Sequence, residues 1–205
     1  MTEKRVSIVR IAFAGLVTVL IAPYAAADEG DRWYAVATAG RSNLRDVCTI
    51  AEAQVSLASC DDESVGWQVL LGRTFGKLLS GEVGYIDAGE AVAYEAGGAS
   101  GTMKVRPQMI TATGVLNISL GKRVNLFAKA GAVYYDTTID FTGGFVAATG
   151  LTSKQERGLE PTIGGGVEWN FSRAFALRVE YAEFNVNDVW FGDIDMTTAG
   201  IRVNF

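Results

Sequence analysis

Histidine is missing from all 205 residues of the chain. It is the side chain most often used as a general base near neutral pH, and it is a common metal ligand. Its absence argues against enzymes that need an acid–base histidine, and no Ser–Lys or paired-carboxylate motif suggests a substitute. We therefore expect a protein that is not an enzyme and that has no cofactor and no metal site.

Proline and positive charge are also scarce. The chain holds 3 prolines against 24 glycines, which favours strands and turns over a helical bundle because glycine weakens helices. It has 18 basic and 23 acidic residues, with no basic run along the sequence. Nucleic acid is therefore not an expected partner.

Only one apolar run of some length is present, and it lies near the start of the chain. The first ten residues are net positive, residues 11–22 are uncharged and mostly apolar, and small residues end the segment at Ala27. This order is typical of a secretory signal peptide. A membrane anchor helix, the alternative, would need about 20 apolar residues. We expect residues 1–27 to be a cleaved signal peptide and residues 28–205 to be the mature domain.

Cysteine occurs twice, at Cys48 and Cys60. An exported protein meets an oxidising compartment, in which an isolated pair usually forms a disulfide. A metal site is the alternative, but the further Cys or His ligands that zinc prefers are absent. The sequence therefore predicts a Cys48–Cys60 disulfide.

The dominant pattern in the mature chain is an alternation of apolar and polar residues with period two. In residues 174–186, for example, Leu177 and Val179 share one face, whereas Arg178 and Glu180 share the other. Eight such segments occur, each near the roughly 9–11 residues that cross a bilayer as a tilted strand. They are residues 32–43, 65–75, 79–88, 108–120, 123–138, 161–171, 174–186 and 194–205. The pattern predicts an all-β fold, an eight-stranded antiparallel up-and-down transmembrane β-barrel without helices.

The connections between these segments alternate in length. Short turns fall at Gly76–Lys77, Gly121–Lys122 and Ser172–Arg173, and longer loops fall near 44–64, 88–106 and 139–158, with a shorter one near 187–193. In an up-and-down barrel the short turns then share one end, as in outer-membrane barrels with short periplasmic turns. We place Pro107 and Pro161 at the starts of their strands, near a rim, because proline cannot donate to a ladder.

A soluble secreted barrel of the lipocalin kind also alternates, with its apolar face inward. Two further features favour the membrane. Aromatic residues lie towards strand ends, where interfacial girdles form: Trp67, Phe75, Tyr85, Tyr134, Trp169, Phe171, Phe175, Tyr181 and Phe205. Charges of both signs lie in mid-strand and can pair inside a narrow lumen: Glu82, Lys129, Glu168, Arg178, Glu180 and Arg202. Facing lipid, each Arg or Lys would cost about 2–4 kcal/mol.

Three segments carry a family resemblance: RWYAVATAG in the first strand, LRVEYAEF in the seventh and AGIRVNF at the end. With them the chain resembles the OmpA-type eight-stranded outer-membrane barrels, a group that includes OmpX-like and opacity-type surface proteins. The resemblance implies location in the Gram-negative outer membrane, contact with its lipid, and a lumen in which the mid-strand charges form a network. It also implies that Ile201, Val203 and Phe205 are read by the barrel assembly machinery.

Two functions follow as hypotheses. In the first, the barrel is a monomeric envelope structural protein whose extracellular loops bind host or envelope surface ligands. In the second, it is a narrow porin-like ion channel, since an eight-stranded barrel has a lumen only wide enough for side chains. A receptor for a small apolar ligand or haem is a third option, in which haem would need Tyr or Met ligation.

Overall fold

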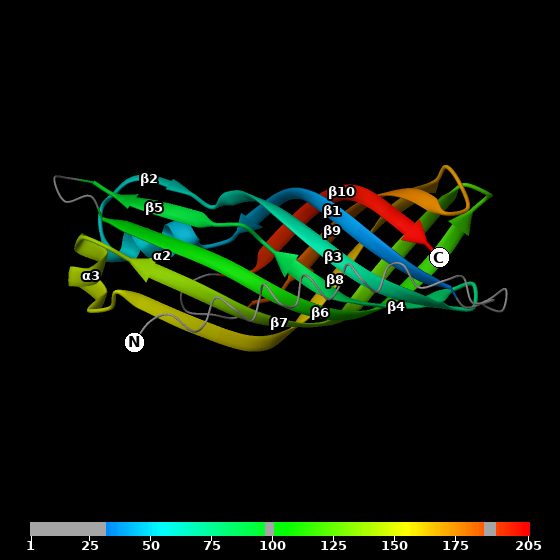
Figure 1. Ribbon diagram of the computed structural model, residues 1–205. Helices are drawn as coiled ribbons and strands as arrows, with labels where there is room; N and C mark the ends of the chain where they lie inside the picture. Colours follow the sequence, from blue (N-terminus) through cyan, green and yellow to red (C-terminus); the bar gives the residue numbers. More distant parts are fainter. Residues whose placement is uncertain (1–31, 97–100, 187–191) are drawn as a thin grey trace.

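The computed structural model describes residues 32–96, 101–186 and 192–205, and the predicted leader lies outside them. The described chain forms ten strands and two short helices (Figure 1). The barrel strands are β1 (Trp33–Leu44), β3 (Glu63–Phe75), β4 (Leu79–Asp87), β6 (Thr102–Leu120), β7 (Val124–Phe141), β8 (Ser153–Asn170), β9 (Phe175–Phe184) and β10 (Ile194–Asn204). The remaining elements are α2 (Val47–Gln54), β2 (Leu57–Asp61), β5 (Ala91–Glu95) and α3 (Gly144–Thr149).

Eight strands of the described chain close into an antiparallel barrel, which confirms the predicted fold class. The order runs β6-β4-β3-β1-β10-β9-β8-β7, and pairing of β6 with β7 completes the ring. The first and last strands pair over eleven positions, from Tyr34↔Asn204 to Leu44↔Ile194. Closure leaves no open sheet edge within the barrel wall, which is what a bilayer requires of strands.

The two ends of the barrel differ. At the end called here the turn end, the described connections are short, over residues 76–78, 121–123 and 171–174. Both Trp33 and the carboxy-terminal Phe205 lie there, since the Phe205 amide donates to the Trp33 carbonyl at 2.9 Å. The long connections gather at the opposite, loop end (Figure 1). In outer-membrane barrels short turns face the periplasm and long loops face outward.

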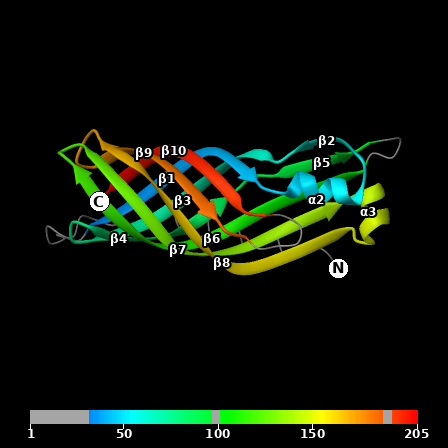
Figure 2. The ribbon, with the colours of Figure 1, turned by 180° about the vertical axis from the view of Figure 1, so that it is seen from behind.

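Our prediction of loops at 44–64, 88–106 and 139–158 is wrong, as is that of a chain without helices. These segments fold into α2, β2, β5 and α3 and into extensions of β6, β7 and β8. Beyond the barrel, the short strands β2 and β5 and the extensions of β6, β7 and β8 form one sheet in the order β2-β5-β6-β7-β8. We call this sheet, together with α2 and α3, the head (Figures 1 and 2). No helix in the described part of the chain has the length and apolar character of a membrane span.

Both prolines lie inside long strands rather than at strand starts, which corrects their predicted position. Pro107 falls between the stretch of β6 that pairs with β5 and the stretch that pairs with β4. Pro161 falls one residue beyond the last β8–β9 pair, Thr162↔Phe184. Each carbonyl still accepts a hydrogen bond, from the amides of Ala88 and Asn185 respectively. The missing N–H groups therefore fall where a neighbouring strand has already ended, as proline in a sheet requires.

The outer wall of the barrel is apolar. Its exposed side chains include Ile110, Leu116, Leu126 and Val179, and aromatic rings gather towards its ends. Trp67 and Tyr85 lie 5.4 Å apart near the loop end, whereas Phe171 stacks on Phe175 at 6.1 Å at the turn end. A continuous apolar surface of this extent is foreign to a soluble monomer and fits a lipid-facing wall.

Candidate functional site

The turn-side half of the lumen holds a compact group of charged side chains, which we call the charge cluster. The structure brings together all six mid-strand charges singled out in the sequence. They come from five strands, and each is almost completely buried: Glu82 on β4, Lys129 on β7, Glu168 on β8, Arg178 and Glu180 on β9, and Arg202 on β10.

Arg178 occupies the centre of this cluster. Its guanidinium donates to both oxygens of Glu82, at 2.6 and 3.1 Å, and to Glu180 Oε2 at 2.8 Å from Nε. A longer bond of 3.2 Å reaches Glu168 Oε1. The guanidinium also lies 4.0 Å from the centre of the Phe127 ring. Three carboxylates and one aromatic face therefore share a single cation.

Two more cations complete the cluster. Lys129 forms an ion pair with Glu180, and Arg202 donates to Glu168 Oε2 at 2.9 Å. Arg202 also lies 3.6 Å from the centre of the Tyr34 ring, whose hydroxyl donates to Glu82 Oε1 at 2.9 Å. Three acids and three bases thus balance in a closed network, the arrangement in which buried charges are tolerated.

Small residues make room for this network. A Cβ added at Gly166 would lie 2.8 Å from the Phe127 ring and 2.0 Å from the Val179 carbonyl oxygen. A Cβ added at Gly72 would lie 2.2 Å from the ring of Tyr34. Glycine at these inward positions lets two aromatic rings reach the guanidinium groups. Neither Tyr34 nor Phe127 was predicted as a member of the charge cluster. Phe127 shares the inward face of β7 with Lys129, which was an available signal, whereas β1 has no inward charge that could have marked Tyr34.

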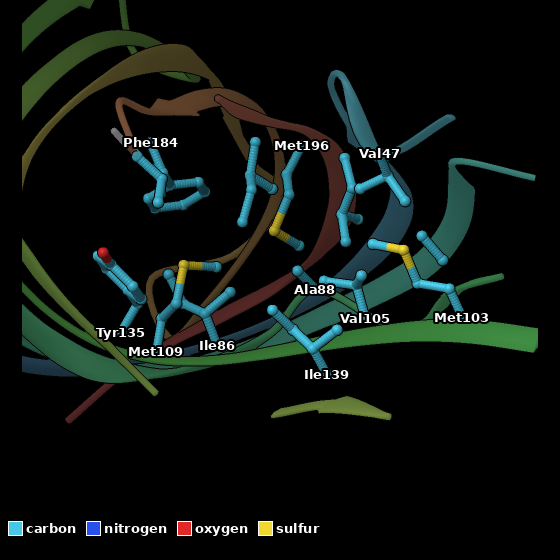
Figure 3. Packing of buried hydrophobic residues seen from close by; sticks show 14 of the residues in the cluster. Val47, Ile86, Ala88, Met103, Val105, Met109, Tyr135, Ile139, Phe184 and Met196 are labelled. Carbon is cyan, nitrogen blue, oxygen red and sulfur yellow. The ribbon is translucent and has the colours of Figure 1, made fainter. Parts of the chain in front are cut away.

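The loop-side half of the lumen is filled instead by an apolar cluster that continues into the head. Figure 3 shows side chains from barrel strands, such as Met109 and Phe184, in one packed group with Val47 of α2 and Met103 of the extended β6. Its buried members are Leu44, Val47, Ala51, Ile86, Ala88, Ala91, Ala93, Met103, Val105, Met109, Val133, Tyr135, Ile139, Phe141, Phe145, Ala182, Phe184, Val186, Ile194 and Met196. One continuous core therefore joins the lumen to the head.

A disulfide joins two elements of the head, as the sequence predicts. Cys48 on α2 and Cys60 on β2 are bonded, with their Cα atoms 5.7 Å apart. The bridge fixes α2 against the small sheet at the place where Val47 and Ala51 enter the apolar cluster. The head is therefore a closed, covalently restrained unit.

The two ends of the molecule carry opposite charge. Among the described residues the turn end has six basic and no acidic side chains, whereas the loop end has fifteen acidic and six basic ones. The loop-end acids are Asp46, Glu52, Asp61, Asp62, Glu63, Asp87, Glu90, Glu95, Asp136, Asp140, Glu156, Glu160, Glu183, Asp193 and Asp195. Since the charge cluster is neutral, the molecule is strongly polarised along its axis.

Some head charges form ion pairs. Glu90 accepts from Lys104 at 3.2 Å and from Arg106 at 2.7 Å. Partial burial acts to raise the pKa of the Glu90 carboxyl, but the two cations together hold this pKa below its usual value. Within the described chain, no group of three or more Cys, Asp or Glu side chains is placed to hold a metal ion.

The three residues of the predicted assembly signal lie on β10 and at its end. Ile201 and Phe205 are exposed, and Val203 is half-buried. All three alternate with the inward-facing Thr198 and Arg202, so they belong to the lipid-facing side. Their reading by the assembly machinery stays a prediction.

Comparisons with known proteins agree with this architecture. The model of the OmpA-like transmembrane domain family matches residues 28–205. Outer membrane protein A of Klebsiella pneumoniae is 27% identical over 180 residues, which are 86% of this chain and 48% of that protein, so the chain spans about half the length of this curated relative.

Solved structures share the barrel fold at low identity. Ail of Yersinia pestis, solved in complex with the heparin analogue sucrose octasulfate, has a TM-score of 0.54 at 13% identity and covers 87% of this chain and 100% of its own. Neisserial surface protein A has a TM-score of 0.54 at 15% identity, with 86% and 100% covered. The chain belongs to the OmpA-like transmembrane domain family and is a β-barrel protein of the outer membrane.

Proposed function

We propose that this protein is an envelope structural and surface-interaction protein that binds its partner through the head. The observation that carries this proposal is the head itself, which has its own sheet, a disulfide and an apolar core continuous with the barrel. A rigid surface loses little conformational entropy when it binds, so a folded head suits recognition better than mobile loops would.

The acid excess of the loop end, which includes the head, favours a partner with a basic surface. Electrostatic complementarity raises association rates and selects partners by charge sign. The heparin analogue bound by Ail is a polyanion, the opposite chemistry, so the shared fold does not carry that ligand over to this chain. We expect basic proteins or peptides of a host or of the envelope as partners.

A headless variant tests the proposal. Residues 45–62, 89–105 and 139–156 are replaced by short turns, and both proteins are reconstituted in lipid vesicles. Polylysine and immobilised basic peptides serve as probes. We expect binding to fall at least about tenfold in the headless barrel, while the gel shift on heating still reports a closed barrel. Equal binding by both proteins would overturn the proposal.

A second variant separates charge from shape. Changing Asp61, Asp62 and Glu63 to Asn, Asn and Gln keeps the side-chain sizes and removes three of the loop-end acids. We expect this variant to lose less binding than the headless barrel does. Added salt should weaken the binding of the wild type as well, because exposed charges are screened beyond about 10 Å at 0.1 M salt. Unchanged binding at low salt would mean that the contact does not depend on these charges.

Two features of the lumen argue against the channel hypothesis. The charge cluster is neutral and fully paired, and the apolar cluster fills the loop-side half. We expect no steady conductance in planar bilayers from the wild type or from Glu168→Ala. Steady wild-type currents would overturn the sealed lumen and favour the channel. The apolar cluster also occupies the space that an apolar ligand or haem would need.

A further inference from the structure

Basic side chains gather at the turn end although they are dispersed along the sequence. They come from the residue before β1, from β3 and from all three short turns: Arg32, Arg73, Lys77, Lys122, Arg123 and Arg173. Within the described chain, this end contains no acidic side chain outside the charge cluster. The result is a ring of positive charge around the mouth of the barrel.

Four of these residues line one open hollow of about 490 Å³, namely Arg32, Lys122, Arg123 and Arg173. Arg202 forms its inner side but is already paired with Glu168. Ser172 and Asn170 add polar groups to the lining, and no acidic residue contributes. The four exposed cations form no ion pair with any other described residue. The hollow is therefore lined by four exposed cations and by no acidic side chain.

The hollow borders the lipid-facing wall. Phe171 is one of its lining residues, and this ring lies 6.3 Å from Trp169 and 6.1 Å from Phe175. All three rings are exposed on the outer wall, at about half of their maximum accessibility. Aromatic rings at strand ends sit at the level of lipid headgroups. An anion in the hollow would thus be held at headgroup height, next to the space that acyl chains occupy.

We propose that this hollow binds the phosphate of an anionic phospholipid from the periplasmic leaflet, with its acyl chains along Trp169, Phe171 and Phe175. Guanidinium groups pair with phosphate through parallel hydrogen bonds, and clusters of Lys and Arg at a membrane surface select anionic lipids. The site lies at the end opposite the head, so it is independent of the proposed surface interaction. It goes beyond that function by assigning a lipid ligand.

Quenching of tryptophan fluorescence by brominated lipids tests the site in the intact protein. The substitutions W67F and W190F leave Trp33 and Trp169 as reporters at the turn end. Vesicles of phosphatidylcholine contain brominated phosphatidylglycerol or, in parallel, brominated phosphatidylcholine. We expect the apparent affinity for phosphatidylglycerol to be at least about fivefold higher, which is the factor that a single nearby Lys or Arg already gives at about 1 kcal/mol. Equal quenching by the two lipids would overturn the proposal.

The triple variant K122Q/R123Q/R173Q should lose this preference. The matched control R41Q/R106Q/R157Q removes three cations from the loop end and should keep it, and a heat-dependent gel shift verifies that both fold. Loss in both variants, or in neither, contradicts a specific site.

Two further arms identify the source of the anion. Inorganic phosphate at millimolar concentration should leave the lipid preference nearly unchanged; if it abolishes the preference, the hollow is a site for free phosphate. Asp28, Glu29 and Asp31 precede Arg32 in the sequence and lie outside the described residues. The variant D28N/E29Q/D31N should keep or strengthen the preference, and its loss would contradict the proposal.

Discussion

The two halves of the barrel interior are both filled by side chains, but one half is charged and the other is apolar. Near the turn end, six charges balance around Arg178, whereas near the loop end apolar side chains fill the lumen and continue into the head. Buried ion pairs gain little net stability but penalise the loss of one partner severely. Apolar packing contributes more evenly, and each lost methylene removes a modest share. We therefore expect the charged half to select one strand register and the apolar half to hold barrel and head together.

The largest effect should come from Arg178→Ala, which breaks the charged half of this comparison. It leaves Glu82, Glu168 and Glu180 buried with only Lys129 and Arg202 to balance them. We expect the free energy of unfolding in lipid vesicles to fall by about 3–5 kcal/mol, the usual penalty for removing one partner of a buried pair.

Arg157→Ala is the matched control for that experiment. Arg157 also pairs with a carboxylate, that of Asp136, but about half of its side chain is exposed. Exposed pairs contribute about 0–1 kcal/mol. Equal losses in the two variants would mean that burial does not distinguish the cluster.

The next largest effect should come from removing the disulfide with Cys48→Ser and Cys60→Ser. In the chain-entropy model a short loop of this kind contributes about 3 kcal/mol. The loss should be confined to the head, so limited proteolysis should cut residues 45–62 faster while the heat-dependent gel shift of the barrel stays. A barrel that no longer shows the shift would mean that head and barrel form one cooperative unit.

A smaller loss of stability should come from a truncation in the apolar half. Ile139→Val removes one methylene from the fully buried part of the apolar cluster, where β7 runs into the head. Such a change typically costs about 0.5–1.5 kcal/mol. Urea unfolding followed by tryptophan fluorescence measures it. A cost several times larger would show that the head core tolerates truncation as poorly as the charge cluster does.

The smallest effect concerns Glu90 and depends on pH. Because its pKa lies below the usual value of a glutamate carboxyl, the folded state favours the ionised carboxylate. Its contribution is therefore present above about pH 4.5 and is lost as pH falls through the lowered pKa. We expect Glu90→Gln to cost less than about 1 kcal/mol at pH 7 and nothing at pH 2. A difference that persists at acid pH would point to packing instead.

Alternation in the sequence predicted the barrel and the inward charges, but it missed the head because the alternation changes phase. In β6 the apolar residues Ile110 and Ala112 face outward, whereas Met103, Val105 and Met109 face inward on the opposite parity. The outer environment changes from lipid to water at this point, so the apolar face must change sides. A search for apolar residues at one constant parity therefore predicts a loop for the head-side part of β6.

Other features leave weaker traces in a sequence. The four cations of the turn-end hollow are spread from Arg32 to Arg173, so no basic run reveals them. The helix α2 has eight residues and only Val47 and Ala51 buried, too short for a helical period to stand out. In contrast, the disulfide was predictable because two cysteines allow a single pairing.

The continuous strands that join barrel and head also determine how far the head extends from the membrane. The strand β7 has 18 residues, and at about 3.3 Å per residue it runs roughly 60 Å from its turn to α3. A tilted strand needs only about 9–11 residues to cross the hydrocarbon core. The remaining residues of β7 extend beyond the membrane and place α3 about 20–25 Å from the lipid surface, at the loop end of the molecule (Figure 1). A partner could meet this tip before it meets the membrane itself.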